Sequence, residues 1–147
     1  MKAYYARPKK AGKFGAVVVI HENRGLNPHI KDVTRRVAKA GYLALASDAL
    51  SPFDGTLQNE DSARELFGKL DTQKNLNNFL KAFDYLKSKP ESNGKTGCVG
   101  FCWGGGLQTS LLLMHLCWML LYHFMEGSLK QRMFRKSKQR FNYIMEV

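Results

Sequence analysis

A chain of 147 residues, of which 44% are hydrophobic, has the size of one domain and can bury a core. Its three cysteines do not suggest a disulfide framework, and its charged N-terminus lacks the apolar run of a signal peptide, so a cytoplasmic location is expected. The formal net charge of +11 suggests a nucleic-acid partner. The basic excess is spread out, however, until a cluster between Lys130 and Arg140, and no specific nucleic acid is expected.

Strands and helices alternate along the chain. The β-branched run Ala16–Ile20 predicts a strand that is buried on both faces. Asn27 and Pro28 form a typical helix start, and Gly41 ends that helix. The other expected elements are strands over 42–46 and 96–101 and helices over 60–70 and 72–88. This order predicts an α/β fold with parallel strands joined through helices.

The segment GFCWGG, residues 100–105, follows the last expected strand. It matches the G-x-[S/C]-x-G pattern of a nucleophile elbow, in which a strained strand-to-helix turn lifts the nucleophile clear of the sheet. Cys102 is therefore the candidate nucleophile. The simpler alternative is that Cys102 is a small buried hydrophobic residue, which is what most cysteines are. Cys98 is expected in the core, and Cys117 has no partner pattern.

A second polar segment, HENRG over residues 21–25, comes directly after the first strong strand. Ligands of open α/β sheets bind at the carboxyl ends of the strands, so Glu22 and Asn23 are expected on the same edge as Cys102. The backbone N–H groups of Asn23 and Trp103 could then form an oxyanion hole. The alternative is that His21 and Glu22 merely end a strand and face water.

These segments, VVVIHENRGLNPHIKDVTRRVAKAGYLALASDAL, SARELFGKLD and NGKTGCVGFCWGGG, resemble the dienelactone hydrolase family over roughly residues 2–106. The resemblance implies a three-layer, parallel-sheet α/β-hydrolase core, incomplete and running through the nucleophile elbow. It implies a cysteine hydrolase of small ester or lactone substrates, with no metal and no cofactor. Cys102 would be the nucleophile and Glu22 would hold its resting thiol and help deliver the proton. Arg24 and Arg64 lie near the positions of the arginines with which the family grips a substrate carboxylate.

The resemblance ends near Leu107, which divides the chain into a core over 1–106 and an aberrant tail over 107–147. The tail has an apolar run, Leu111–Tyr122, which is shorter than the roughly 20 residues of a membrane span. A basic stretch follows it. The family's triad Asp and His would lie in this part of the chain and are not recognisable there. We therefore expect an inactive chain that exposes an open sheet edge and self-associates.

Two other functions stay open. Four histidines, His21, His29, His115 and His123, could supply a general base, and a hydrolase with a rearranged triad would use one from the tail. Alternatively, the chain is a non-catalytic module whose basic tail binds an anionic membrane surface or nucleic acid.

A frameshift explains the tail. When each new codon takes the third base of one codon and the first two of the next, several residues are fixed by the genetic code. Met114 with His115 gives Ala, Trp118 with Met119 gives Asp, and Met125 with Glu126 gives Gly. Permitted choices elsewhere yield a string similar to the family's continuation. This hypothesis places a frameshift within a few codons of Gly106.

The nucleotide sequence tests this hypothesis. We expect the offset frame to stay open beyond the codon for Val147, to encode a Gly-x-x-Asp-like segment, and later to encode a Gly-His pair. Sequencing the gene and translating all frames is the measurement. Early stop codons in the offset frame would contradict the frameshift and favour a functional tail.

Overall fold

The computed structural model describes residues 1–104 and residue 107, and its centre is a four-stranded sheet in the order β1-β3-β2-β4. Strands β2 (Phe14–Ile20), β3 (Leu43–Ser47) and β4 (Ser92–Gly100) are parallel to one another. Strand β1 (Ala3–Ala6) pairs antiparallel with β3 at one edge. The predicted α/β fold is confirmed, and β1, which the sequence analysis did not include, makes the sheet mixed.

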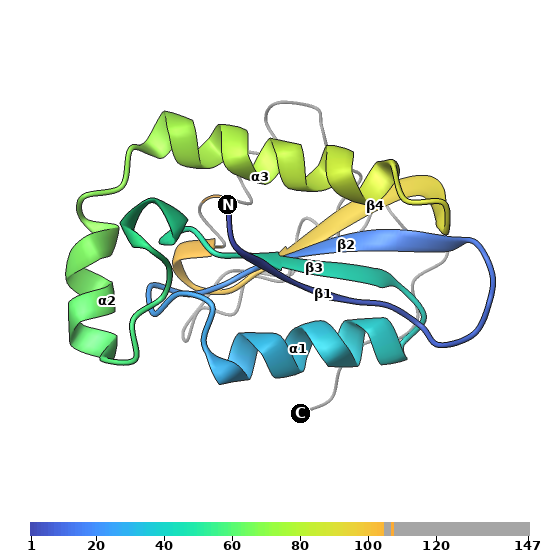
Figure 1. The fold of residues 1–147 in the computed structure, drawn as a ribbon, viewed down its shortest axis with the longest axis horizontal. Coiled ribbons are helices and arrows are strands. Elements are labelled where there is room, and N and C mark those ends of the chain that lie inside the picture. Colours follow the sequence, from blue (N-terminus) through green and yellow to red (C-terminus); the bar gives the residue numbers. More distant parts are fainter. Residues whose placement is uncertain (105–106, 108–147) are drawn as a thin grey trace, which may run out of the picture.

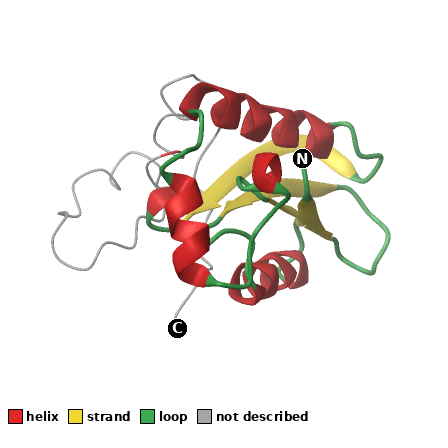
Figure 2. Cartoon of the chain, turned by 60° about the vertical axis from the view of Figure 1, so that its left-hand side comes forward, coloured by secondary structure: helices red, strands yellow, loops and turns green. Residues whose placement is uncertain are grey.

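Helices cover both faces of the sheet (Figure 1). Helix α1 (Pro28–Lys39) lies on one face and α3 (Thr72–Lys87) on the other. The short α2 (Glu60–Phe67) lies beside the carboxyl ends of the parallel strands, and a 3-10 turn (Ser51–Phe53) precedes it (Figure 2). The three layers leave the carboxyl edge of the sheet bordered by loops and α2.

The side chains of β2 point alternately to the two faces of the sheet, and this explains the two apolar cores. Val18 and Ile20 pack in the cluster that contains the buried face of α3, whereas Val19 packs in the cluster that contains Ile30 and Val33 of α1. Successive side chains of a strand point to opposite faces, so a continuous apolar run suits a strand covered on both sides. The interpretation of Ala16–Ile20 as a doubly buried strand is confirmed.

The helix boundaries follow the local chemistry of the chain. The side chain of Asn27 accepts a hydrogen bond from the Ile30 N–H at 3.0 Å, and Pro28 opens α1, as predicted. Gly41 follows the end of α1 with φ of 101°, a left-handed conformation that favours glycine. Asn59 and Asp71 cap α2 and α3 in the same way as Asn27 caps α1.

Strand β4 begins earlier than the sequence indicates. The predicted strand begins at residue 96, whereas β4 begins at Ser92 and includes Asn93 and Gly94, a pair typical of turns. Gly94 has φ of 79°, and the register between β2 and β4 shifts between Phe14 and Ala16. The turn-forming residues therefore remain part of the sheet, which accommodates them as an irregularity within β4.

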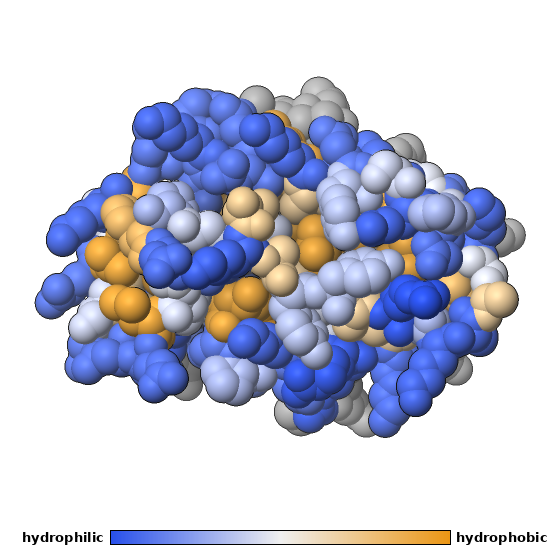
Figure 3. All heavy atoms as spheres, viewed as in Figure 1, coloured by the Kyte–Doolittle hydropathy of each residue, from blue (hydrophilic) through white to orange (hydrophobic). Residues whose placement is uncertain are grey.

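Hydrophilic side chains dominate the exposed surface over α3, and hydrophobic ones gather between the helical layers (Figure 3). No described helix has both the length and the apolar character needed to cross a membrane. Strand β4 ends the strand order and, among the described residues, pairs with β2 alone. The expected self-association at such an edge stays a prediction.

Candidate active site

Cys102 lies at a sharp turn directly after β4. Its φ is 49°, an unusual conformation for a residue other than glycine, and its side chain is exposed. Residues 103–104 are already helical, and the Gly104 N–H donates to the Phe101 carbonyl at 2.8 Å. A strained residue between a strand and a helix, presented to solvent, is the geometry of a nucleophile elbow. Cys102 is thus not a buried core residue, whereas Cys98 in β4 is buried as expected.

The pairing of β2 with β4 brings the two polar segments to one edge. Ile20 is in register with Gly100, and the Phe101 N–H donates to the Ile20 carbonyl at 3.2 Å. Glu22 and Cys102 each follow this paired position by two residues, so both lie at the carboxyl edge of the sheet. Glu22 is half-buried there.

Gly104 allows the elbow to approach β2 closely. A Cβ atom at this position would lie 2.7 Å from the carbonyl oxygens of both Ile20 and His21. Such a distance is well inside van der Waals contact, so only glycine fits without a backbone shift. The position of Cys102 over the sheet edge therefore depends on the absence of a side chain at Gly104.

Two backbone donors are available near Cys102. Among the described residues, no hydrogen bond engages the backbone N–H of Asn23 or of Trp103. Asn23 is in the turn after β2, which the hydrogen bond from the Gly25 N–H to the Glu22 carbonyl closes at 3.3 Å. Trp103 opens the helical segment after Cys102. Unused N–H groups of this kind can stabilise an oxyanion.

His21 does not face water. Its side chain is fully buried, and both ring nitrogens have partners. Nε2 accepts from the Ala49 N–H at 3.1 Å, and Nδ1 lies 2.7 Å from the Glu22 carbonyl oxygen. A carbonyl only accepts, so Nδ1 carries the proton and the ring is neutral. Burial lowers the pKa of His21 below its ordinary value. This residue is therefore excluded as the general base for Cys102, because its unprotonated nitrogen is occupied.

Phe67 of α2 completes an aromatic cluster with His21 and Trp103. The His21 and Trp103 rings are stacked, with centroids 5.8 Å apart and an angle of 13°. The Phe67 ring meets both edge-on, with centroids 5.6 Å from His21 and 4.9 Å from Trp103. The sequence analysis missed Phe67, since one aromatic residue on a short helix carries no distinguishing signal.

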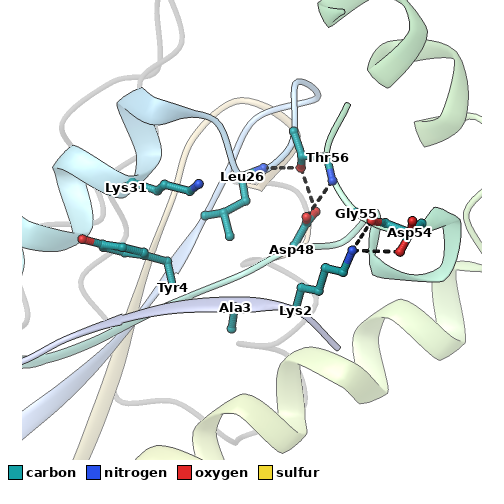
Figure 4. A pocket seen from close by; sticks show the side chains of 9 residues that line it. All are labelled: Lys2, Ala3, Tyr4, Leu26, Lys31, Asp48, Asp54, Gly55 and Thr56. Atoms are coloured by element: carbon teal, nitrogen blue, oxygen red, sulfur yellow. Dashed lines mark hydrogen bonds and ion pairs between the residues drawn. The ribbon is translucent and has the colours of Figure 1, made fainter. Parts of the chain in front are cut away.

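Asp48, buried at the end of β3, anchors a hydrogen-bond network that joins two loops (Figure 4). Its carboxylate accepts from the Thr56 N–H at 2.8 Å, from the Thr56 hydroxyl at 2.9 Å and from the Leu50 N–H at 3.0 Å. The Thr56 oxygen in turn accepts from the Leu26 N–H at 2.7 Å. Gly25 has φ of 77°, and a Cβ there would overlap the Thr56 hydroxyl. The network fixes the loop after β2 against the loop after β3.

A cavity of about 300 Å³ lies beside this network (Figure 4). Neither Cys102 nor Glu22 lines it. Lys2 forms an ion pair with Asp54 at its rim, at 2.8 Å. Its lining residues are Lys2, Ala3, Tyr4, Leu26, Lys31, Asp48, Asp54, Gly55 and Thr56. The cavity is therefore separate from Cys102.

The two candidate substrate-binding arginines lie near one face of α2. Arg24 pairs with Glu60, with 3.1 Å between Nη1 and Oε2. Arg64 follows Glu60 by four positions on the same helix, a spacing that places side chains next to each other. Arg64 is exposed. Their role toward a substrate stays a prediction.

The remaining candidate groups are His29, a metal site, and the residues of the tail. His29 is exposed in the first turn of α1. Within residues 1–104 and 107, no group of three His, Cys, Asp or Glu side chains is placed to hold a metal ion. Cys117, His115, His123 and the basic cluster of the tail lie outside the described residues.

Comparison with known proteins identifies the family of the chain. The family model described as "Dienelactone hydrolase family" matches residues 1–115 of the chain. The chain belongs to the dienelactone hydrolase family. The match includes both the loop after β2 and the elbow.

Among curated relatives, a hydrolase fragment of Escherichia coli named YghX is 57% identical over 72 residues, which are 48% of this chain and 62% of that protein. A protein of Methylorubrum extorquens named as a carboxymethylenebutenolidase is 36% identical over 107 residues, 70% of this chain and 37% of its own. The chain thus spans less than two thirds of these relatives.

Solved structures of the family share the fold. The crystal structure named as a dienelactone hydrolase of Klebsiella pneumoniae has a TM-score of 0.60 and 32% identity, covering 70% of this chain and 45% of that one. The dienelactone hydrolase-like phosphotriesterase P91, from metagenomic libraries, has a TM-score of 0.52 and 31% identity, covering 70% of this chain and 43% of its own. The described residues therefore form part of the α/β-hydrolase core of this family.

Replacing Gly104 tests the close approach. We expect Gly104→Ala to lower the free energy of unfolding by about 1–3 kcal/mol. The new methyl group would push the elbow away from the carbonyl oxygens of Ile20 and His21. Gly68→Ala is the matched control, since Gly68 has φ of −64° and its Cβ would meet only the Glu65 oxygen at 3.4 Å. Denaturant unfolding of the full chain measures both, and equal stability of the two variants would contradict the close approach.

Acid should destabilise the fold through His21. The unfolded chain binds a proton at this histidine below about pH 6.5, whereas burial keeps the folded state neutral to lower pH. Stability is therefore present in full above pH 6.5 and falls as the pH drops toward the lowered pKa of folded His21. We expect His21→Gln to flatten this acidic slope in unfolding measured from pH 7.5 to 5.

The exposed His29 provides the control for this titration. His29→Gln should leave the slope of the wild-type chain unchanged, because the side chain is exposed to solvent when folded. A slope that His21→Gln does not alter would show that the buried ring does not couple folding to protonation.

Proposed function

We propose that this chain is a cysteine hydrolase of the dienelactone hydrolase type, in which Cys102 attacks the carbonyl carbon of an ester or lactone. One observation carries the proposal: Cys102 is exposed and held at φ of 49° between β4 and a helical segment. Residues held in such strained backbone conformations cluster at active sites, and this supports a chemical role for Cys102. Membership of the family supports the same chemistry.

The proposed first step forms a thioester. The Cys102 sulfur adds to the carbonyl carbon, and the carbonyl oxygen becomes an oxyanion that the Asn23 and Trp103 N–H groups stabilise. The bond from this carbon to the alkoxy oxygen then breaks. The leaving oxygen takes up the proton that began on the thiol, with Glu22 as the carrier. An ester loses its alcohol, whereas the opened lactone stays attached through its acyl group.

Arg24 and Arg64 are the proposed contacts for a substrate carboxylate. Arg24 pairs with the Glu60 carboxylate at 3.1 Å, and this contact supports a role for its guanidinium group toward an anion. The exposed Arg64 is available on the same side of α2. A small ester or lactone that carries a carboxylate is therefore the substrate class that fits.

Release of the acyl group needs a different residue. Water must lose a proton to a general base, which needs an unoccupied acceptor within reach. Among the described residues, His21 has no free nitrogen and His29 is exposed on α1. We propose that the described residues acylate Cys102 and release the product slowly, so that the chain does not turn over. The alternative of a tail that binds a membrane surface or nucleic acid concerns residues outside the described ones and stays a prediction.

An activated ester separates the two steps. With p-nitrophenyl acetate, we expect at most one acetyl group per chain, located at Cys102 by peptide mass mapping, and release slower than uptake by at least about tenfold. Cys102→Ala should abolish this labelling, and Cys98→Ala should leave it unchanged because Cys98 is buried. Added imidazole, which supplies a base from solution, should accelerate release.

Three results would contradict the proposal. Labelling that persists in Cys102→Ala would exclude Cys102 as the nucleophile. Failure of the wild-type chain to become acylated would exclude the thioester step. Rapid turnover that is lost in His115→Ala or His123→Ala would instead show that the tail supplies the base.

A further inference from the structure

We propose that His21 is a positioning residue for the Cys102 elbow: its ring fixes Trp103 against the Glu22–Asn23 turn and so sets the spacing of the two oxyanion donors. The inference rests on the proposed function, because it concerns the same site. It gives a role to a buried polar residue that takes no part in the chemistry itself.

The backbone position of His21 makes this role possible. His21 comes directly after β2 and directly before Glu22, at the edge where β2 and β4 end. Its own carbonyl oxygen lies in the contact that only a glycine at position 104 permits. The main chain of His21 therefore touches the elbow on one side and continues into the turn that holds Asn23 on the other.

Two hydrogen bonds hold the His21 ring in a single orientation. Nδ1 donates to the Glu22 carbonyl at 2.7 Å, and Nε2 accepts from the Ala49 N–H at 3.1 Å. The Glu22 carbonyl also accepts from the Gly25 N–H, so the ring helps to close the turn that contains Asn23. Ala49 follows Asp48, whose carboxylate the Thr56 and Leu50 groups hold. The ring is thereby anchored on both sides by fixed backbone.

The face of the ring then positions Trp103. The two rings are stacked at 13° and 5.8 Å, and Phe67 closes the cluster from the side of α2. A ring with two hydrogen bonds cannot rotate without breaking one, so it offers Trp103 a surface of fixed tilt. One proposed donor is the backbone N–H of Trp103 itself. The other, the Asn23 N–H, belongs to the turn that the His21 ring helps to close.

The consequence is specific for acyl transfer. An oxyanion needs donors about 3 Å away in the correct direction, and a displacement of about 1 Å can reduce the rate by roughly a hundredfold. Alkylation of a thiol by iodoacetamide forms no oxyanion and does not need these donors. A change at His21 should therefore affect acylation of Cys102 much more than its alkylation.

Three near-isosteric variants separate hydrogen bonding from packing. His21→Gln can place an acceptor near the Nε2 position toward Ala49, and His21→Asn can place a donor near the Nδ1 position toward Glu22. His21→Phe keeps an aromatic ring against Trp103 but loses both hydrogen bonds. The full chain of each variant is treated with p-nitrophenyl acetate and, separately, with iodoacetamide, and both rates at Cys102 are followed by mass spectrometry.

We expect acylation to fall in the order wild type, then Gln and Asn, then Phe, with His21→Phe slower than wild type by about tenfold or more. Alkylation should stay within about threefold in every variant, which also shows that the elbow is folded. The partial recovery by Gln or Asn over Phe is the signature of a ring held by its hydrogen bonds.

The opposite results overturn the inference. If His21→Phe acylates as fast as the wild type or faster than Gln and Asn, the ring acts through packing alone. If acylation and alkylation fall together, His21 supports the fold and does not position donors. If the wild-type chain alkylates but never acylates, the proposed function fails as well, which is distinct from a loss confined to the variants.

Discussion

The contact between Gly104 and the end of β2 is the constraint on which the rest of the site depends. A Cβ at position 104 would lie 2.7 Å from two strand carbonyls, so the helical segment after Cys102 rests directly on the backbone of Ile20 and His21. The chain must turn within two residues of Gly100 to make this contact. Cys102 takes up that turn with φ of 49°, which raises its side chain above the sheet edge. The strained conformation is thus a consequence of close packing next to it.

Buried polar groups stabilise the edge where the site lies. An unpartnered buried donor or acceptor costs about 1–3 kcal/mol, which makes each satisfied group a strong constraint on the loop that satisfies it. Asp48 uses its carboxylate for backbone and hydroxyl groups of the loop after β3, and His21 uses both nitrogens for the loops after β2 and β3. The same loops also bury Leu26, Ala49 and Leu50, so hydrogen bonding and packing together set their conformations.

The sequence was sufficient for the elements whose local chemistry agrees with their place in the fold. The run Ala16–Ile20, the Asn27 cap and the apolar face of 72–88 each have one structural solution, and all three are confirmed. Strand β1 is only four residues long and is defined by its pairing with β3, a contact that no local pattern reveals. Gly94 is typical of a turn by its sequence, and it lies within β4 because that segment pairs with the neighbouring strand β2.

The same distinction applies to the site. The elbow motif identified an exposed, strained Cys102 because glycine spacing expresses a backbone requirement directly. The environment of His21 could not be predicted, since the residue after a strand can turn toward solvent or inward with the same sequence. Its partners, Ala49, Trp103 and Phe67, lie 28 or more positions away in the chain. Only the folded sheet edge brings them together.

In the proposed reaction, acylation and release place different demands on this edge. Attack by the thiol requires an exposed sulfur and two backbone donors, and these come from residues within three positions of the ends of β2 and β4. Release requires a base with an unoccupied acceptor. His21 is the histidine nearest in sequence to Glu22 and Asn23. The hydrogen bonds that hold its ring in place occupy the nitrogen that a general base would need. Because Nε2 accepts from the Ala49 N–H, the ring keeps this orientation only as long as Nε2 takes no proton from water or thiol. In the proposed reaction, the base for release would therefore come from a segment other than the loop that carries His21 and Asn23.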